Sequence, residues 1–76
     1  MAKLPIVKPK QVIAALERAD FFIDHQTGSH ARLIHQTKPQ RRVSVPMHNK
    51  DLKKGTLKNI LRQAELSVEE FIKLLS

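Results

Sequence analysis

The chain has 76 residues and no cysteine, and its 14 lysines and arginines against 7 aspartates and glutamates give a formal net charge of +7. So short a chain supports one hydrophobic core and leaves no room for a large enclosed cavity, so we expect any site to be an open face or a shallow groove. The lack of cysteine excludes a disulfide framework, a thiol nucleophile and a thiolate metal site, and the charge favours a nucleic-acid partner over a merely solubilising surface.

The first predicted element is a helix over residues 9–19, preceded by an extended lead-in. Pro9 suits the first turn of a helix because its fixed φ is already helical. The helical spacing is carried by the apolar residues Val12, Ile13, Leu16 and Ala19. Asp20 is expected to close the helix, because aspartate tolerates the left-handed conformation better than most residues.

Three strands follow. Residues 21–26 and 30–35 are predicted to form a β-hairpin around a turn at 26–29, and a second turn at 37–40 leads to a short strand over 42–45. Alternation in this last strand places Val43 and Val45 on one face. In the strand 30–35 the alternation is imperfect, so the sequence leaves open which of its residues face the core.

The C-terminal part is predicted to hold two helices after a polar loop over 47–54. The first starts near Gly55–Thr56 and runs to Ala64, with a break near Glu65. Ser67 and Glu70 have the spacing of a capping box, which opens the final helix. Apolar positions at helical spacing in that helix are Val68, Phe71, Ile72 and Leu75.

These elements predict an α+β fold: a three-stranded antiparallel sheet covered on one face by helices, in the order α-β-β-β-α with an additional C-terminal helix. The helices over 9–19 and 56–64 should pack side by side on the covered face. We expect one domain over residues 1–76, with its core in 8–75. No apolar run is long enough to span a membrane and the N-terminus does not have the form of a signal peptide, so a cytoplasmic location is expected.

The triplet Gly28-Ser29-His30 stands where the turn of the hairpin meets the second strand. Glycine allows a sharp turn there because it adopts φ > 0 at little cost. The strand would then hold the histidine at the rim of the sheet, and histidine is the side-chain type that can both take and give a proton near neutral pH. His30 is therefore the candidate catalytic residue, with Gly28 and Ser29 as its structural turn.

The other histidines, His25, His35 and His48, are interpreted as solvated strand or loop residues. Their spacing does not match a metal-binding motif, so no metal is expected. With two glycines in the chain, a P-loop and a dinucleotide fingerprint are also absent, and no cofactor is predicted.

Basic residues gather around the start of the helix that follows the polar loop. Unpaired amides and the helix dipole make such an end attractive to phosphate. The candidate phosphate-binding residues, which would be the RNA-binding residues of a nucleic-acid-binding chain, are Lys50, Lys53, Lys54 and Lys58, with Arg41 and Arg42 on the strand hairpin that is expected to flank them. A solvated charged loop is the alternative interpretation.

Several segments together resemble a known family. The element order is similar to that of the double-stranded-RNA-binding domain. The HicA (YcfA-like) toxins share with this chain the triplet 28–30, Val-Pro-Met-His at 45–48, and the run 52–64 that contains Lys-Gly-Thr-Leu. The resemblance covers roughly residues 8–75, and the triplet and the Lys-Gly-Thr-Leu run at this separation are together quite specific.

The resemblance implies an mRNA interferase of a toxin–antitoxin pair that needs no metal, with the histidine of the triplet, here His30, required for activity. It also implies a HicB antitoxin as partner, with operator DNA contacted only through the antitoxin. The chain departs from the family at Ala31, where many members have a second histidine, and at Asp20 and Glu65, where glycine is usual.

Two classes of function follow from the residues. In the first, His30 acts as general base or general acid in metal-independent cleavage of RNA, and Lys53 and Lys54 hold the phosphate. In the second, the same fold binds duplex RNA by shape without cleaving it, which requires the lysines and not His30. An adaptor that binds only protein is a third possibility, distinguished by the absence of salt-dependent RNA affinity.

Overall fold

Three antiparallel strands and three helices follow one another along the chain in a computed structural model, which describes residues 3–75. The elements are α1 (Pro9–Arg18), β1 (Phe21–Gln26), β2 (His30–His35), β3 (Arg42–Pro46), α2 (Lys54–Ala64) and α3 (Val68–Leu75). This confirms the α+β class and the predicted order. The expected domain, 1–76, includes residues 1–2 and 76, which lie outside the described residues.

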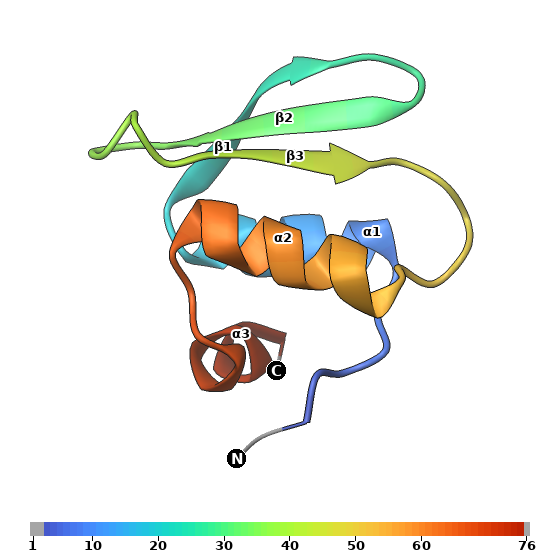
Figure 1. Ribbon diagram of the computed structural model, residues 1–76. Coiled ribbons are helices and arrows are strands. Elements are labelled where there is room, and N and C mark those ends of the chain that lie inside the picture. The colour runs from blue at the N-terminus through green and yellow to red at the C-terminus, as the bar shows by residue number, and fades with distance from the viewer. Residues whose placement is uncertain (1–2, 76) are drawn as a thin grey trace.

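The sheet has the strand order β1-β2-β3, and both neighbouring pairs are antiparallel. Its covered face carries Ala31 and Leu33 of β2 and Val43 and Val45 of β3, all of them buried. The structure thus answers the question that the imperfect alternation of β2 left open. The opposite face, which we call the open face, carries none of the helices that the structure describes within residues 3–75 (Figure 1).

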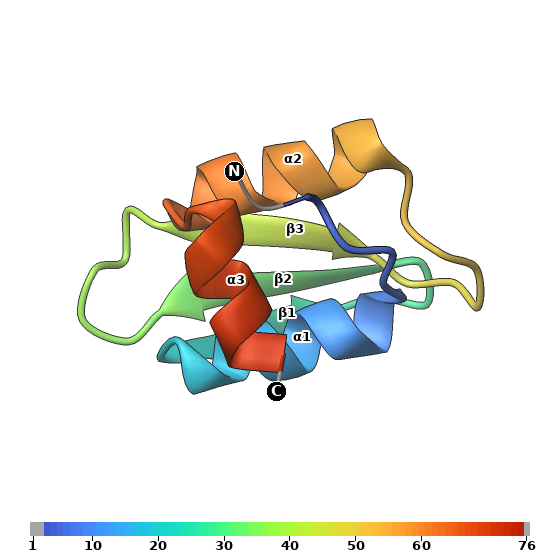
Figure 2. The ribbon, with the colours of Figure 1, turned by 90° about the horizontal axis from the view of Figure 1, so that it is seen from below.

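The helices lie together on the covered face. In Figure 1, α1 and α2 run beneath the sheet; α2 contacts β3, and α1 contacts β1 and β3. Seen from below in Figure 2, α3 crosses this layer and packs against α1. Phe71 of α3 is completely buried, so the last helix contributes a large aromatic side chain to the core, whose apolar area stabilises the fold by about 2–3 kcal/mol.

Most element bounds agree with those predicted, and the differences have simple causes. Helix α1 ends one residue early, with Ala19 as its C-cap, and α2 begins at Lys54, with Lys53 as its N-cap. Strand β3 continues through Pro46, which pairs with His30. A proline is tolerated there because β3 is an edge strand and its last residue need not donate to the ladder.

The predicted capping box at the start of α3 is present. The Ser67 N–H donates to Glu70 Oε1 over 2.9 Å, and the Glu70 N–H donates to Ser67 Oγ over 3.1 Å. The bond from the Ser67 backbone, with that from its hydroxyl, holds the pKa of the Glu70 carboxyl below its usual value. These reciprocal bonds pair two amides that the first turn of the helix leaves without partners.

Two helices end in left-handed residues that are not glycine. Asp20, just after α1, has φ 70°, and Glu65, the C-cap of α2, has φ 58°. These are the two positions at which the chain lacks the glycine usual in the resembling family. A side chain in this region is strained, although aspartate tolerates it better than most.

Replacing Asp20 with glycine should therefore stabilise the fold. We expect Asp20→Gly to raise the free energy of unfolding by about 0.5–1 kcal/mol, because relief of strain outweighs the added freedom of the unfolded chain. Urea denaturation measures the change. Asp20→Ala is the matched control and should be less stable than the parent, and a glycine variant less stable than the alanine variant would contradict the strain argument.

Candidate functional site

The connection between β1 and β2 is closed by Thr27. Its N–H donates to the His30 carbonyl over 2.8 Å, and the His30 N–H donates to Thr27 Oγ1 over 3.1 Å. A longer bond of 3.4 Å joins the Ser29 N–H to the same oxygen. One threonine hydroxyl oxygen thus accepts hydrogen bonds from two amides of the turn, as Ser and Thr side chains do in local turn motifs. The sequence analysis overlooked Thr27, although a threonine two residues before Ser29 is a signal for such a motif.

Gly28 does not play the part expected of it. It lies in the connection, but its φ is not positive, and a Cβ added there would meet no atom within 4 Å. The expectation that the turn depends on the left-handed freedom of this glycine is therefore wrong. The hydrogen bonds of Thr27 shape the connection instead.

His30 is the first residue of β2 and is exposed. Its Nδ1 lies 3.1 Å from Ser29 Oγ, and the Met47 N–H donates to the Ser29 carbonyl over 2.7 Å. The turn is thereby anchored to the chain that leaves β3. With Nδ1 engaged, Nε2 is the ring nitrogen available for proton exchange; no partner for it is present among residues 3–75.

The side chain of His30 lies on the open face of the sheet. Ala31, the next residue, is completely buried against the helices, and successive side chains of a strand point to opposite faces. Arg32 shares the open face with His30 for the same reason. Across the strands, His25 pairs with Arg32, and Arg32 pairs with Ser44, so His25 and Ser44 lie on this face too.

Two of the remaining histidines are tied into the backbone. His35 Nδ1 accepts bonds from the N–H groups of Thr37 and Lys38 at 3.2 and 3.1 Å, and its ring meets Phe21 edge-on. His48 Nδ1 accepts a 3.1 Å bond from the Lys50 N–H. His25 is exposed on β1, and its imidazole makes no hydrogen bond with any of the described residues.

The lysines Lys50, Lys53, Lys54 and Lys58 gather around the start of α2, and we call this group the lysine corner. All four are exposed, and Lys53 and Lys54 are the N-cap and first residue of the helix. Their charge adds to the positive end of the helix dipole, an arrangement that attracts phosphate. Figure 1 places this end of α2 on the same side of the molecule as the connection between β1 and β2.

Arg41 and Arg42 do not flank the lysine corner. Arg41 Nε lies 3.1 Å from Glu65 Oε2, in an ion pair without hydrogen-bond geometry, and Glu65 is the C-cap at the opposite end of α2. Arg42 begins β3 and its Nε–H donates to the Pro39 carbonyl over 3.1 Å. The expected neighbourhood is wrong because β3 and α2 run in opposite directions, which carries the start of β3 to the far end of the helix.

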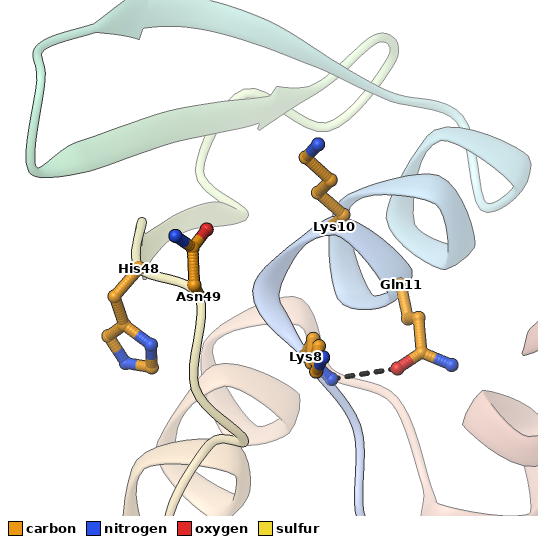
Figure 3. A pocket seen from close by; sticks show the side chains of 5 residues that line it. All are labelled: Lys8, Lys10, Gln11, His48 and Asn49. Carbon is orange, nitrogen blue, oxygen red and sulfur yellow. Dashed lines mark hydrogen bonds between the residues drawn. The ribbon is translucent and has the colours of Figure 1, made fainter.

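A shallow pocket of about 340 Å³ opens next to the lysine corner. It is lined by Lys8, Lys10, Gln11, His48 and Asn49. Figure 3 shows that the first three come from the start of α1 and the other two from the loop before α2, with the Lys8 N–H donating to Gln11 Oε1 over 2.8 Å. Lys8 and Lys10 thus extend the basic surface to a second helix, which the sequence analysis did not predict.

Two further properties bear on the kind of site. No group of three or more histidine, cysteine, aspartate or glutamate side chains within residues 3–75 is placed to hold a metal ion. None of the helices in the same range is long and apolar enough to cross a membrane.

A family model described as "HicA toxin of bacterial toxin-antitoxin" matches residues 9–66. The match covers more than half of the chain, from α1 to the residues just after α2, and includes the triplet 28–30 and the lysine corner. No curated protein matches the sequence. The chain belongs to the HicA toxin family and is the toxin of a toxin–antitoxin system.

The hydrogen bonds of Thr27 make a direct prediction. Thr27→Val keeps the shape of the side chain but removes the oxygen, so the amide of His30 should exchange its hydrogen faster. Because one exposed hydrogen bond is worth about 1 kcal/mol or less, global stability should fall only slightly. Amide hydrogen exchange followed by NMR measures the effect.

Gly28→Ala is the matched control for the same turn. Since φ is not positive and a Cβ meets nothing, the exchange of His30 should be unchanged and the stability altered by about 0.5 kcal/mol or less. Faster exchange in Gly28→Ala than in Thr27→Val would show that the glycine, not the threonine, determines the turn.

Proposed function

We propose that this HicA-family toxin is an endoribonuclease that cleaves messenger RNA without a metal ion, with His30 as an acid–base group. The observation that carries the proposal is the way His30 is held. Thr27 and Ser29 bind its backbone and Nδ1, while the ring stays exposed on the open face. An immobilised histidine with a free Nε2 suits proton transfer at neutral pH.

RNA carries its own nucleophile, which is why little catalytic machinery is needed. A base takes the proton of the ribose 2′-hydroxyl, the 2′-oxygen bonds to phosphorus, and the bond to the 5′-oxygen breaks as that oxygen receives a proton. The products are a 2′,3′-cyclic phosphate and a 5′-hydroxyl. His30 performs one of the two proton transfers, and a positioned group of this kind contributes about 10²–10⁴-fold to the rate.

The basic surface binds the RNA strand. The lysine corner, with Lys8 and Lys10 beside the pocket, offers several cations and a helix N-terminus to phosphate groups. These cations lie at or just before the starts of α1 and α2, on the covered side of the sheet, whereas His30 lies on the open face. We therefore assign them to phosphates that flank the cleaved bond. Arg41 is paired with Glu65, so it should contribute less than the lysines.

A non-catalytic module that binds duplex RNA is the second candidate. The arrangement that favours it is the basic surface shared by α1 and α2 next to the β1–β2 connection, since phosphates and 2′-hydroxyls of a duplex are recognised by shape and charge. Such a module needs the lysines and has no use for an immobilised His30.

The partner that neutralises the toxin is, in this proposal, an acidic HicB-type antitoxin in the cytoplasm. Charge complementarity to a chain of net charge +7 would drive rapid association. Blocking requires that the antitoxin cover His30 and the lysine corner, so that RNA and antitoxin compete. Contact with DNA would then be made by the antitoxin, not by this chain.

The proposed cleavage can be tested directly. In the presence of EDTA, the purified protein should cut a defined messenger RNA, His30→Ala should reduce the rate about 10²–10⁴-fold, and Lys53→Ala/Lys54→Ala should mainly weaken binding in a salt-dependent manner. Denaturing gel electrophoresis and filter binding give the two readouts. An His30→Ala variant as fast as the parent overturns the assignment, and salt-sensitive binding of RNA that stays intact favours the binding module.

The proposed antitoxin can be tested by binding. The product of the reading frame adjacent to the toxin should form a stable complex with it, abolish RNA binding, and be displaced more easily at high salt. Competition measured by fluorescence anisotropy with labelled RNA tests this. A complex that still binds RNA with the affinity of the free toxin would contradict a shared surface.

A further inference from the structure

Cleavage of RNA needs two proton transfers, and His30 accounts for one. We infer that His25 is the second acid–base group and that Arg32 is the cation that faces the reacting phosphate. This inference rests on the proposed function and deepens it. It comes from the strand register, which brings these three residues together on the open face.

The register places His25 and His30 on the open face as diagonal neighbours, each next to Arg32. His25 on β1 pairs directly with Arg32 on β2, and His30 is two residues before Arg32, on the same face. Side chains directly opposite each other in such a pair have Cβ atoms about 5 Å apart, and diagonal neighbours are separated by about 7 Å. A phosphodiester placed over Arg32 is therefore within reach of a histidine on each side.

A β-bulge is what turns His25 to the open face. Ile23 pairs with Leu33, and the register shifts before His25. In a regular ladder, Asp24 would pair with Arg32, and His25 would pair with Ala31 on the covered face. Because the bulge leaves Asp24 unpaired, His25 takes the position opposite Arg32. An imidazole and not a carboxylate therefore lies beside the arginine. Bulges occur frequently next to active sites, where they redirect a side chain.

His25 is also free to take part in chemistry. His35 and His48 accept backbone hydrogen bonds at Nδ1, whereas the imidazole of His25 has no hydrogen-bond partner among the described residues. Besides the two histidines, the charged groups near this face are Arg32 on β2, Arg42 on β3 and the bulged residue Asp24. Arg32 is the only one of these cations in direct register with His25.

The step balances with these residues alone. One histidine accepts the proton of the 2′-hydroxyl as the 2′-oxygen bonds to phosphorus. The other, as imidazolium, gives its proton to the 5′-oxygen as the bond from phosphorus breaks. The guanidinium of Arg32 binds the phosphoryl oxygens, whose negative charge increases in the transition state. No water or metal ion is consumed in this step.

The test uses the full chain and a short RNA with a fluorophore and a quencher at its ends, in EDTA, over a range of pH. His25→Gln should lower the rate about 10²–10⁴-fold, and one limb of the bell-shaped pH profile of kcat/KM should disappear. Arg32→Gln should reduce kcat about 10²–10³-fold with little change in KM. Thermal unfolding of each variant checks that the fold is kept.

Gln26→Ala is the matched control. Gln26 follows His25 on the same strand but pairs with Ala31, so it lies on the other face, and its change should leave the rate and the pH profile as in the parent. If His30→Ala abolishes cleavage while His25→Gln keeps the parent's rate and both limbs, the inference is wrong and the proposed function stands. A parent that leaves RNA intact overturns both.

Discussion

The register of β2 between its two neighbours is the constraint on which the rest of the molecule depends. Ala31 and Leu33 are completely buried on the covered face. Because side chains alternate along a strand, these two residues determine the face on which each of the remaining residues of β2 lies. A slip of one residue would move His30 and Arg32 into the core and Leu33 into water. Burial of a leucine side chain alone is worth about 1.5–3 kcal/mol, so a register slip is strongly disfavoured. The packing of the core therefore determines where the residues of the candidate site lie on the opposite face.

The helices strengthen this constraint at the edges of the sheet. The Ser44 N–H on the edge strand β3 donates to Gln63 Oε1 of α2 over 3.2 Å, so the helix covers one backbone donor that the strand presents outward. On the side of the helix layer away from the sheet, α3 packs on α1, and its Phe71 is completely buried. The family match ends at residue 66, before α3 begins, yet this helix completes the core of the chain.

Much of the fold was predictable from the sequence because it follows from local patterns. The spacing of apolar residues predicted the helices, the pair Ser67 and Glu70 predicted a cap, and Val43 and Val45 predicted the buried face of β3. The site was less predictable. A bulge inserts one unpaired residue, and nothing in the strand Phe21–Gln26 distinguishes the inserted residue from its neighbours. The position of Arg41 depended on the antiparallel course of β3 and α2, which local spacing does not contain.

The same reasoning explains why the role of the glycine in the triplet was misjudged, whereas the position of His30 at the start of β2 was predicted correctly. Turn glycines are usually selected for left-handed backbone, but in this chain a threonine hydroxyl provides the partners for the turn, and the left-handed positions, Asp20 and Glu65, lie at helix ends. The place of His30 follows from the strand that begins there, whatever closes the turn. An open sheet face with one covered side is the site that so small a core allows. Such a face would be accessible to the RNA strand of the proposed reaction, and for the same reason to a protein partner that covers it.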